Sequence, residues 1–318
     1  MTPTVSIVMP FRDAAAHLEE AVASTLAQTF NDWELLLVDD GSTDRSPAIA
    51  SAAARADPRI QVHRRPPGVP GNAAAARNVG IAHACGAFVA FLDADDAYEP
   101  ERLASHLRAF ERHPGVEVVY GPTRWWHPGA EHLDAVEDVR AVAGRVHRPP
   151  ELLTRVLLLQ RGQVPCTCSV TIRRAALQRV GGFEEAFELY EDQTLWVKLL
   201  LRCRAYVTDE VGARYRQHDA STTARSIAAG RYDRMRPHEA REPFLAWVGE
   251  HARADGPVEP SVERALRLAL APYPGQEAAL TPGDRVARTA WRSADRLRTL
   301  PRRARRKVRK LTGARREP

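Results

Sequence analysis

Short apolar runs alternate, along the first third of the chain, with segments in which apolar residues recur at helical spacing. Four runs have the length of buried strands: 5–10, 35–38, 60–63 and 88–92. Between them, 14–28 carries Leu18, Val22 and Leu26 on one helical face, and 73–84 is rich in alanine. Strands that alternate with helices indicate right-handed βαβ units. We therefore predict an α/β fold with a mostly parallel, Rossmann-like sheet flanked by helices.

The run 88–92 ends in three carboxylates, those of Asp93, Asp95 and Asp96. The C-terminal ends of parallel strands line the crevice in which open α/β sheets bind ligands. Because three adjacent carboxylates repel one another, a hard divalent cation, Mg²⁺ or Mn²⁺, completed by phosphate oxygens would stabilise them. The alternative is a solvated acidic turn that leads into a helix N-terminus, where Asp is favoured in any case.

A second pair of acids, Asp39 and Asp40, follows the run 35–38. Both runs belong to the predicted parallel sheet, so we expect both sets of acids at the same edge. The alternative for 40–42 is a tight turn followed by the N-cap of a helix that starts from Asp44. The two interpretations are compatible, because turn chemistry and ligand binding can share residues.

Six motifs follow one another in the order typical of family 2 glycosyltransferases and cover about residues 4–220. They are VSIVMPFRD at 5–13, WELLLVDDGSTD at 33–44, ARNVG at 76–80, FLDADD at 91–96, GGF at 181–183 and YED at 190–192. The sequence thus resembles an inverting member of that family with the GT-A fold. The resemblance implies transfer of a sugar from a UDP-, GDP- or dTDP-linked donor to a glycan or lipid-linked acceptor, in the synthesis of envelope polysaccharide or glycoconjugates.

The resemblance also implies a base-binding region after the first two strands. Pro10, Phe11 and Asp13 would line the base pocket, and Asp40 would accept hydrogen bonds from the base. Arg12 departs from the Asn that the family often has at this place, so the detailed base contacts differ here.

Further nucleotide and metal contacts are implied for the third and fourth motifs. Asp95 matches the metal ligand, Asp93 and Ala94 would contact the nucleotide sugar, with Asp93 facing either its ribose or the metal, and Asp96 would support them. Arg77 matches a nucleotide contact, since a guanidinium donates in a fork to ribose or phosphate oxygens. The alternative for Arg77 is a surface ion pair on a helix.

Glu191 and Asp192 stand at the start of a predicted amphipathic helix that continues with apolar residues at helical spacing. Acids in a first turn complement the helix dipole, which is one explanation for them. The resemblance implies another: Asp192 is the general base that takes the proton of the acceptor hydroxyl, and Glu191 orients the acceptor or the base. A single displacement of this kind inverts the anomeric configuration.

His218 follows a short predicted strand near 213–215 and matches a family segment whose His approaches the metal or the diphosphate. Neutral imidazole is a competent Mn²⁺ ligand. The alternative is a solvated loop histidine. Trp125 and Trp126 follow another predicted strand, 116–120, and are expected either in the core or as a shelf on which an acceptor sugar stacks.

The length of 318 residues, 44% of them hydrophobic, suffices for a full core. No apolar run approaches the ~20 residues needed to span a bilayer, and the chain enters its first strand directly, so we expect a cytoplasmic protein without a signal peptide. The four cysteines lack zinc-like spacing, and Cys166 and Cys168 are expected on an extended segment, pointing the same way. We divide the chain into a catalytic domain at 1–220, a helical extension at 221–296 and a tail at 297–318.

The tail at 297–318 holds ten Lys or Arg and one acid, a net charge of +9 against +6 for the whole chain, which leaves −3 for the rest. Its apolar residues fall on one helical face, and a basic amphipathic helix suits an anionic membrane surface, here the inner face of the plasma membrane. Nucleic acid is a less favoured partner, and a disordered solubilising tail is the alternative.

Two other functions remain open at this point. A nucleotidyltransferase would share the sheet and the metal, although the Gly-rich loop such enzymes carry after the first strand is missing. A non-catalytic nucleotide-sugar-binding module would have no need for Asp192. The Gln-x-x-Arg-Trp pattern of processive relatives is also missing, so we expect one sugar to be added per encounter.

Overall fold

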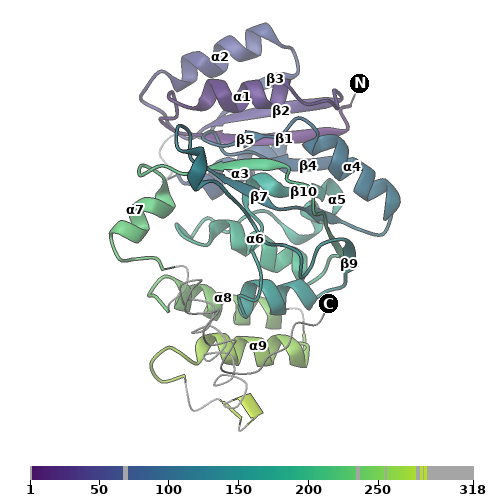
Figure 1. Ribbon diagram of the computed structural model, residues 1–318, viewed down its shortest axis with the longest axis vertical. Coiled ribbons are helices and arrows are strands. Elements are labelled where there is room, and N and C mark those ends of the chain that lie inside the picture. The colour runs from purple at the N-terminus through teal and green to yellow at the C-terminus, as the bar shows by residue number, and fades with distance from the viewer. Residues whose placement is uncertain are drawn as a thin grey trace.

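The computed structural model describes residues 2–66, 71–233, 237–254, 256–276, 280–281 and 283–284. Within these residues the chain forms an eight-stranded sheet in the order β3-β2-β1-β4-β10-β6-β11-β9 and a four-stranded sheet in the order β5-β12-β7-β8. Figure 1 shows α1 and α2 at one end of the molecule and α8 and α9 at the other, with the large sheet between them. The α/β fold predicted from the sequence is confirmed.

The first half of the large sheet is parallel, as predicted. Its strands are β3 (Ile60–Arg64), β2 (Trp33–Asp39), β1 (Val5–Phe11) and β4 (Phe88–Phe91). They are connected by α1 (Leu18–Leu26), α2 (Ser46–Ala56) and α3 (Ala73–His83). β1 and β2 are buried along their whole length, because helices cover both faces of the sheet.

The two faces of this half-sheet belong to different apolar clusters, since neighbouring residues of a strand point to opposite faces. Val8 and Leu36 pack with Ala74 of α3 on one face. Ile7 and Leu35 pack with Leu18 of α1 on the other.

The second half of the sheet is mixed, but four of the seven strand pairings of the whole sheet are parallel, in keeping with the expected mostly parallel sheet. β10 (Val170–Arg173) runs antiparallel to both of its neighbours, β4 and β6 (Val118–Tyr120). β11 (Ala205–Val207) pairs parallel to β6, and β9 (Arg145–His147) closes this edge antiparallel to β11. α4 (Arg102–Arg112) and α5 (Arg174–Val180) belong to this half. The antiparallel neighbours need no crossover helix, so the alternation read from the first third of the chain does not extend here.

The small sheet carries the chain past the end of β4. Its strands are β5 (Ala97–Tyr98), β12 (Ala213–Arg216), β7 (Thr123–Trp126) and β8 (Ala135–Val136). β12 pairs antiparallel to β5 and parallel to β7. The pairing brings residues after 213 beside the acidic loop at 93–96, more than a hundred positions earlier in the chain.

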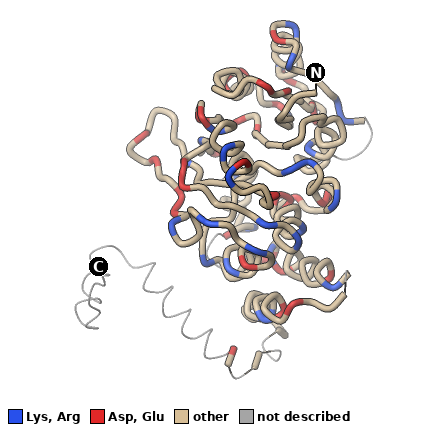
Figure 2. The backbone as a smooth tube through the Cα atoms, turned by 90° about the vertical axis from the view of Figure 1, so that its right-hand side faces the viewer, with Lys and Arg blue, Asp and Glu red and all other residues tan. Residues whose placement is uncertain are grey.

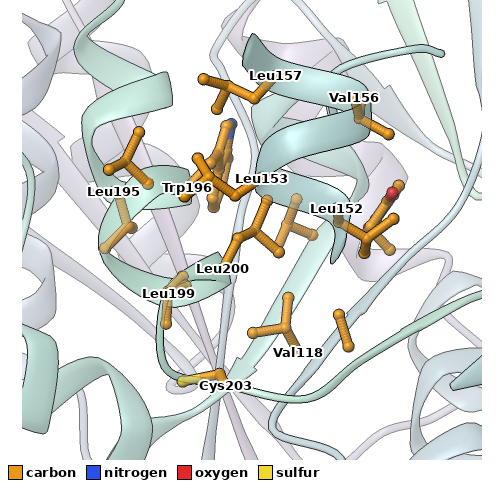
Figure 3. Close-up of a cluster of buried hydrophobic side chains, with 14 of the residues drawn as sticks. Val118, Leu152, Leu153, Val156, Leu157, Leu195, Trp196, Leu199, Leu200 and Cys203 are labelled. Atoms are coloured by element: carbon orange, nitrogen blue, oxygen red, sulfur yellow. The ribbon is translucent and has the colours of Figure 1, made fainter. Parts of the chain in front are cut away.

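The helices that follow enclose the largest apolar cluster. α6 (Glu191–Leu200) packs against the helix Leu153–Leu158, which has π-type hydrogen bonding, through Trp196, Leu199 and Leu200 (Figure 3). The extension adds α7 (Thr222–Ala228), α8 (Arg241–Arg253) and α9 (Pro260–Leu270). α8 and α9 contribute buried residues to the same cluster, so the described part of the segment after residue 220 shares a core with the elements that precede it.

One local expectation is wrong. The segment with Cys166 and Cys168 is not extended: Thr167–Ser169 forms a 3-10 turn, closed by hydrogen bonds from Ser169 to the Cys166 carbonyl oxygen. A second 3-10 turn spans Glu131–Leu133.

Within the part of the chain that the structure describes, no helix is long and apolar enough to cross a membrane. Basic and acidic residues are interspersed over this part (Figure 2). The predicted amphipathic tail at 297–318 lies outside the described residues, as does the last portion of the extension.

Candidate active site

The site is built where β1, β2 and β4 end side by side. Phe11 and Asp39 are register partners at the ends of β1 and β2, and the Asp40 N–H donates to the Phe11 carbonyl oxygen over 2.9 Å. On the other side of β1, the Leu92 N–H donates to the Val8 carbonyl oxygen over 3.1 Å. The acids after β2 and after β4 therefore lie along one edge of the sheet, as expected from the sequence.

The residues predicted to line the base pocket hold the loops after β1 and β2 together. Pro10 and Phe11 are buried. Asp13, with a left-handed φ of 48°, accepts hydrogen bonds from the Thr43 N–H at 2.7 Å and the Asp44 N–H at 3.2 Å. The Thr43 N–H is the main reason why the pKa of the exposed Asp13 lies below its ordinary value. The structure thus places these residues at the predicted edge and assigns Asp13 a loop-bracing contact.

Asp40 is buried and ion-paired. It contacts the Arg65 guanidinium, and Arg12 lies 3.9 Å away. Gly71 approaches so closely that a Cβ there would lie 2.1 Å from Asp40 Oδ1. The Arg65 pair follows from the parallel register of β2 and β3: Asp39 is the partner of Arg64, so the next residues along the two strands, Asp40 and Arg65, also lie side by side.

Arg77 links acids from two distant motifs. Its Nη2 lies 2.6 Å from Asp93 Oδ1 and its Nη1 lies 3.4 Å from Glu191 Oε1, while the side chain is only 4% exposed. Burial would lower the pKa of Arg77, but the charges of Asp93 and Glu191 outweigh it and raise the pKa. A surface ion pair is therefore the wrong description: Arg77 is a buried bridge, which α3 can position because Gly80 lets the helix lie against Val8 of β1.

Asp95 and His218 form the pair predicted to hold a metal. His218 Nε2 lies 3.0 Å from Asp95 Oδ2, and the side chains are 24% and 32% exposed. Burial raises the pKa of Asp95, but the hydrogen bond and charge of His218 outweigh it, so the net shift is downward. The aspartate is held in its anionic form, which is the form that binds a cation.

Arg216, two residues before His218, fixes the acidic loop in place. Its N–H donates to Asp96 Oδ1 over 2.9 Å and its Nε donates to the Asp95 carbonyl oxygen over 2.7 Å. Its Nη2 pairs with Glu20 of α1 at 2.5 Å. Asp96 is 1% exposed, and burial raises its pKa. Asp96 therefore supports the acidic loop as a buried hydrogen-bond acceptor, in line with the expectation. The contributions of Arg216 and Glu20 to holding this loop were not predicted.

A divalent cation fits the pair of Asp95 and His218. One carboxylate and one imidazole, both partly open to solvent, suffice for Mn²⁺ or Mg²⁺ when diphosphate oxygens and water complete the shell. No group of three or more His, Cys, Asp or Glu able to hold a metal occurs among the described residues.

Glu191 and Asp192 begin α6, as predicted, and lie across Arg77 from Asp93. Burial raises the pKa of Asp192 to about 7, and the Glu191 carboxylate adds to the shift while Arg77 opposes it. Burial also raises the pKa of Glu191, against the charge of Arg77. A carboxyl group that titrates near neutral pH can both release and accept a proton there.

The two tryptophans, Trp125 and Trp126, do not belong to the fully buried core, which was one of the two expectations for them. Both are half-buried in β7. The Trp126 ring lies against the guanidinium groups of Arg216, at 4.1 Å, and Arg214, at 4.6 Å. Trp125 Nε1 donates to Glu137 over 3.3 Å. Trp126 is thus occupied in bracing β12, the strand that delivers His218 to Asp95.

The comparisons with known proteins agree with this geometry. The family model described as Glycosyl transferase family 2 matches residues 6–181. The O-antigen biosynthesis protein RfbC of Myxococcus xanthus is 31% identical over 260 residues, which are 80% of this chain and 19% of that protein. The chain thus spans about a fifth of the length of this curated relative.

Two solved structures share the fold. S. aureus TarS 1–349 in complex with UDP-GlcNAc superposes with a TM-score of 0.59 at 20% identity, covering 87% of this chain and 73% of that one. The mannosyltransferase PcManGT of Pyrobaculum calidifontis, in complex with GDP-Man and Mn²⁺, gives a TM-score of 0.60 at 18% identity, covering 98% and 80%.

Proposed function

The chain belongs to glycosyl transferase family 2, and from that premise we propose that it moves one sugar per encounter, with inversion, from a nucleotide-sugar donor to a glycan or lipid-linked acceptor of the cell envelope. The observation that carries the proposal is the buried Arg77 bridge between Asp93 and Glu191. The bridge joins the acids after β4, which suit a donor, to the acid pair of α6, which suits an acceptor. An enzyme needs both within one site.

The donor would occupy the edge formed by β1, β2 and β4. Asp40 accepts hydrogen bonds from the base, with Pro10, Phe11 and Asp13 shaping the adjoining loops, while Asp93 and Ala94 contact the ribose and the sugar. TarS with UDP-GlcNAc and PcManGT with GDP-Man are sugar-nucleotide complexes of the same fold, which supports this class of donor.

A divalent cation, Mn²⁺ or Mg²⁺, would be held by Asp95 and His218. When bound, it neutralises charge on the leaving diphosphate. Arg216 holds the loop at 93–96 in place, so the Asp95 carboxylate stays next to the His218 imidazole and both could bind the same cation.

Asp192 would act as the general base. Its carboxylate accepts the proton of the acceptor hydroxyl while that oxygen bonds to the anomeric carbon and the bond from that carbon to the diphosphate breaks. A pKa of about 7 suits this role, because the group is ionised in a large fraction of molecules at neutral pH and still accepts a proton readily. Glu191, held by Arg77, orients Asp192 or the acceptor.

The acceptor is assigned to envelope glycans by a weaker argument. The Myxococcus xanthus relative is named for O-antigen biosynthesis, although the chain matches only 19% of its length. We extend the proposal to a cytoplasmic enzyme that reaches an anionic membrane surface through its tail at 297–318.

The decisive experiment measures release of UDP, GDP or dTDP from a panel of sugar nucleotides, with and without acceptor glycans, in Mn²⁺, in Mg²⁺ and in EDTA. We expect one donor to be consumed in a cation-dependent manner, and the product to have the opposite anomeric configuration by NMR. Release of pyrophosphate from a nucleoside triphosphate, in a parallel reaction supplied with a sugar 1-phosphate, would instead identify a nucleotidyltransferase. Tight donor binding without any turnover across acceptors would identify a binding module.

A further inference from the structure

The residue that precedes the acid pair has an unusual backbone. Tyr190 stands at the N-cap of α6 with φ 70° and ψ 10°, in the left-handed region that favours glycine. Its carbonyl oxygen accepts the Thr194 N–H over 3.0 Å, so this conformation sets the first turn of α6. A bulky side chain at such a position is strained unless its surroundings hold it.

The side chain of Tyr190 is held by the helical extension. Its ring lies almost parallel to that of Phe244 in α8, with centroids 4.7 Å apart and planes at 10°. Its hydroxyl oxygen lies 2.8 Å from His238 Nε2. The His238 carbonyl oxygen in turn accepts from the Tyr273 hydroxyl over 3.3 Å. Tyr190 is only 7% exposed. Its ring is therefore fixed by Phe244 and His238, two residues that stand about fifty positions later in the sequence.

The extension is itself tied to the partner helix of α6. Arg241, at the start of α8, donates from Nη2 to the Leu158 carbonyl oxygen over 3.0 Å. The helix Leu153–Leu158 packs against Trp196 and Leu199 of α6 (Figure 3). The extension therefore contacts the N-cap residue of α6, Tyr190, and also holds the helix Leu153–Leu158 that packs along α6.

We propose that Tyr190, clamped by His238 and Phe244, is a positioning residue that holds Glu191 and Asp192 toward Arg77, so that the extension is part of the catalytic apparatus. This inference rests on the proposed role of Asp192. It assigns to residues 238–244 a function beyond packing: they stabilise a strained turn whose orientation decides where the two carboxylates point.

The first test compares two residues on the same face of α8. Phe244→Leu removes the ring that lies against Tyr190, whereas Trp247→Leu removes a ring that contacts Phe187, Phe244 and His251, and no aromatic contact between Trp247 and Tyr190 occurs among the described residues. We expect both variants to lose thermal stability and only Phe244→Leu to lower kcat, by about tenfold, with the donor KM within twofold. Equal kcat in the two variants at matched loss of Tm would overturn the proposal.

The second test separates the ring from the backbone. Tyr190→Gly fits the left-handed conformation better than Tyr190→Ala but lacks the clamp equally. If the clamp positions the acids, both variants lose kcat to a similar extent, and Tyr190→Phe, which keeps the ring, retains most of it. A Tyr190→Gly variant with wild-type kcat would refute the clamp. His238→Gln, which can still accept from the phenol, should recover more kcat than His238→Ala.

A double variant distinguishes this inference from the proposed function. If the clamp acts through Asp192, Phe244→Leu should have no further effect on kcat in an Asp192→Asn background. If Asp192→Asn alone retains turnover, the assignment of Asp192 as the base fails, and the clamp cannot act on catalysis by positioning that residue. If Asp192→Asn has the strongly lowered kcat that we expect but Phe244→Leu behaves like Trp247→Leu, only the clamp is wrong.

Discussion

The proposed donor side and the proposed acceptor side of the site are held in different ways. On the donor side, the acids follow directly from the ends of β2 and β4, and the parallel pairing with β1 fixes their separation. On the acceptor side, Glu191 and Asp192 depend on contacts from α3 and, in our proposal, from α8, which lie far away in the sequence. The comparison suggests that donor binding tolerates distant changes, whereas turnover is sensitive to them.

The largest effect is expected at the donor side. Asp95→Asn removes a charge at nearly constant volume, so the site loses its cation but keeps its shape. We expect cation-dependent transfer to fall below detection, with Tm little changed. Titration of activity with Mn²⁺ is the measurement, and His218→Gln should shift the same titration to higher Mn²⁺. Wild-type turnover of Asp95→Asn at saturating Mn²⁺ would show that the metal is held elsewhere.

The next effect belongs to the acceptor side. Asp192→Asn should lower kcat by roughly 10²–10⁴-fold while leaving donor binding intact. In the wild type, kcat should rise with pH through about 7, as Asp192 loses its proton. Calorimetry of UDP or GDP binding beside steady-state kinetics separates the two quantities. Loss of nucleotide affinity at unchanged kcat would show that Asp192 binds the donor and is not the base.

Asp192→Asn, which lowers kcat, is expected to raise the stability of the fold at alkaline pH. The pKa of Asp192 is raised on folding, so its contribution to stability is lost as pH rises from about 4 to about 7. Asn has no charge to bury, and we expect Asp192→Asn to be more stable than wild type by about 2 kcal/mol at pH 8 and about equal to it near pH 4. Chemical denaturation at both pH values checks the sign. A variant less stable than wild type at pH 8 would contradict the buried, raised-pKa description.

Arg77, which joins the two sides, should give an intermediate effect. Arg77→Lys keeps the charge but cannot reach both Asp93 and Glu191, so we expect kcat to fall about 10–100-fold and stability by about 2 kcal/mol. Arg102→Lys is the matched control: Arg102 is equally buried, but its partners are Thr171 Oγ1 and the carbonyl oxygens of Cys168 and Val170. Comparable loss of kcat in the control would indicate general softening of the fold.

The smallest effect on catalysis is expected from the tail. A chain ending at Arg296 should transfer sugar to a soluble acceptor at the wild-type rate but lose binding to anionic liposomes. Each basic residue near such a surface contributes about 1 kcal/mol before screening, so binding of the full chain should also fall steeply with salt. Co-sedimentation at low and high salt is the assay. Equal sedimentation of both chains, or a preference for duplex DNA, would exclude the membrane assignment.

The sequence by itself determined what depends on local order. The apolar runs predicted β1, β2 and β4, and the acids after the last two runs predicted the shared edge at which Asp40, Asp93 and Asp95 lie, because strand period and βαβ handedness leave little choice. The start of α6 at Glu191 was likewise predicted from helical spacing.

Only the tertiary structure decided which distant groups pair. The bridge of Arg77 to Asp93 and Glu191, the bracing of the acidic loop by Arg216 and the stacking of Tyr190 on Phe244 join segments that no short-range pattern connects. The antiparallel position of β10 between β4 and β6 was likewise decided by the tertiary structure and not by a short-range pattern in the sequence. Such contacts follow from packing the whole core, and burial then raises the pKa of Asp192 to the neutral range, a property that its neighbours in the sequence do not supply.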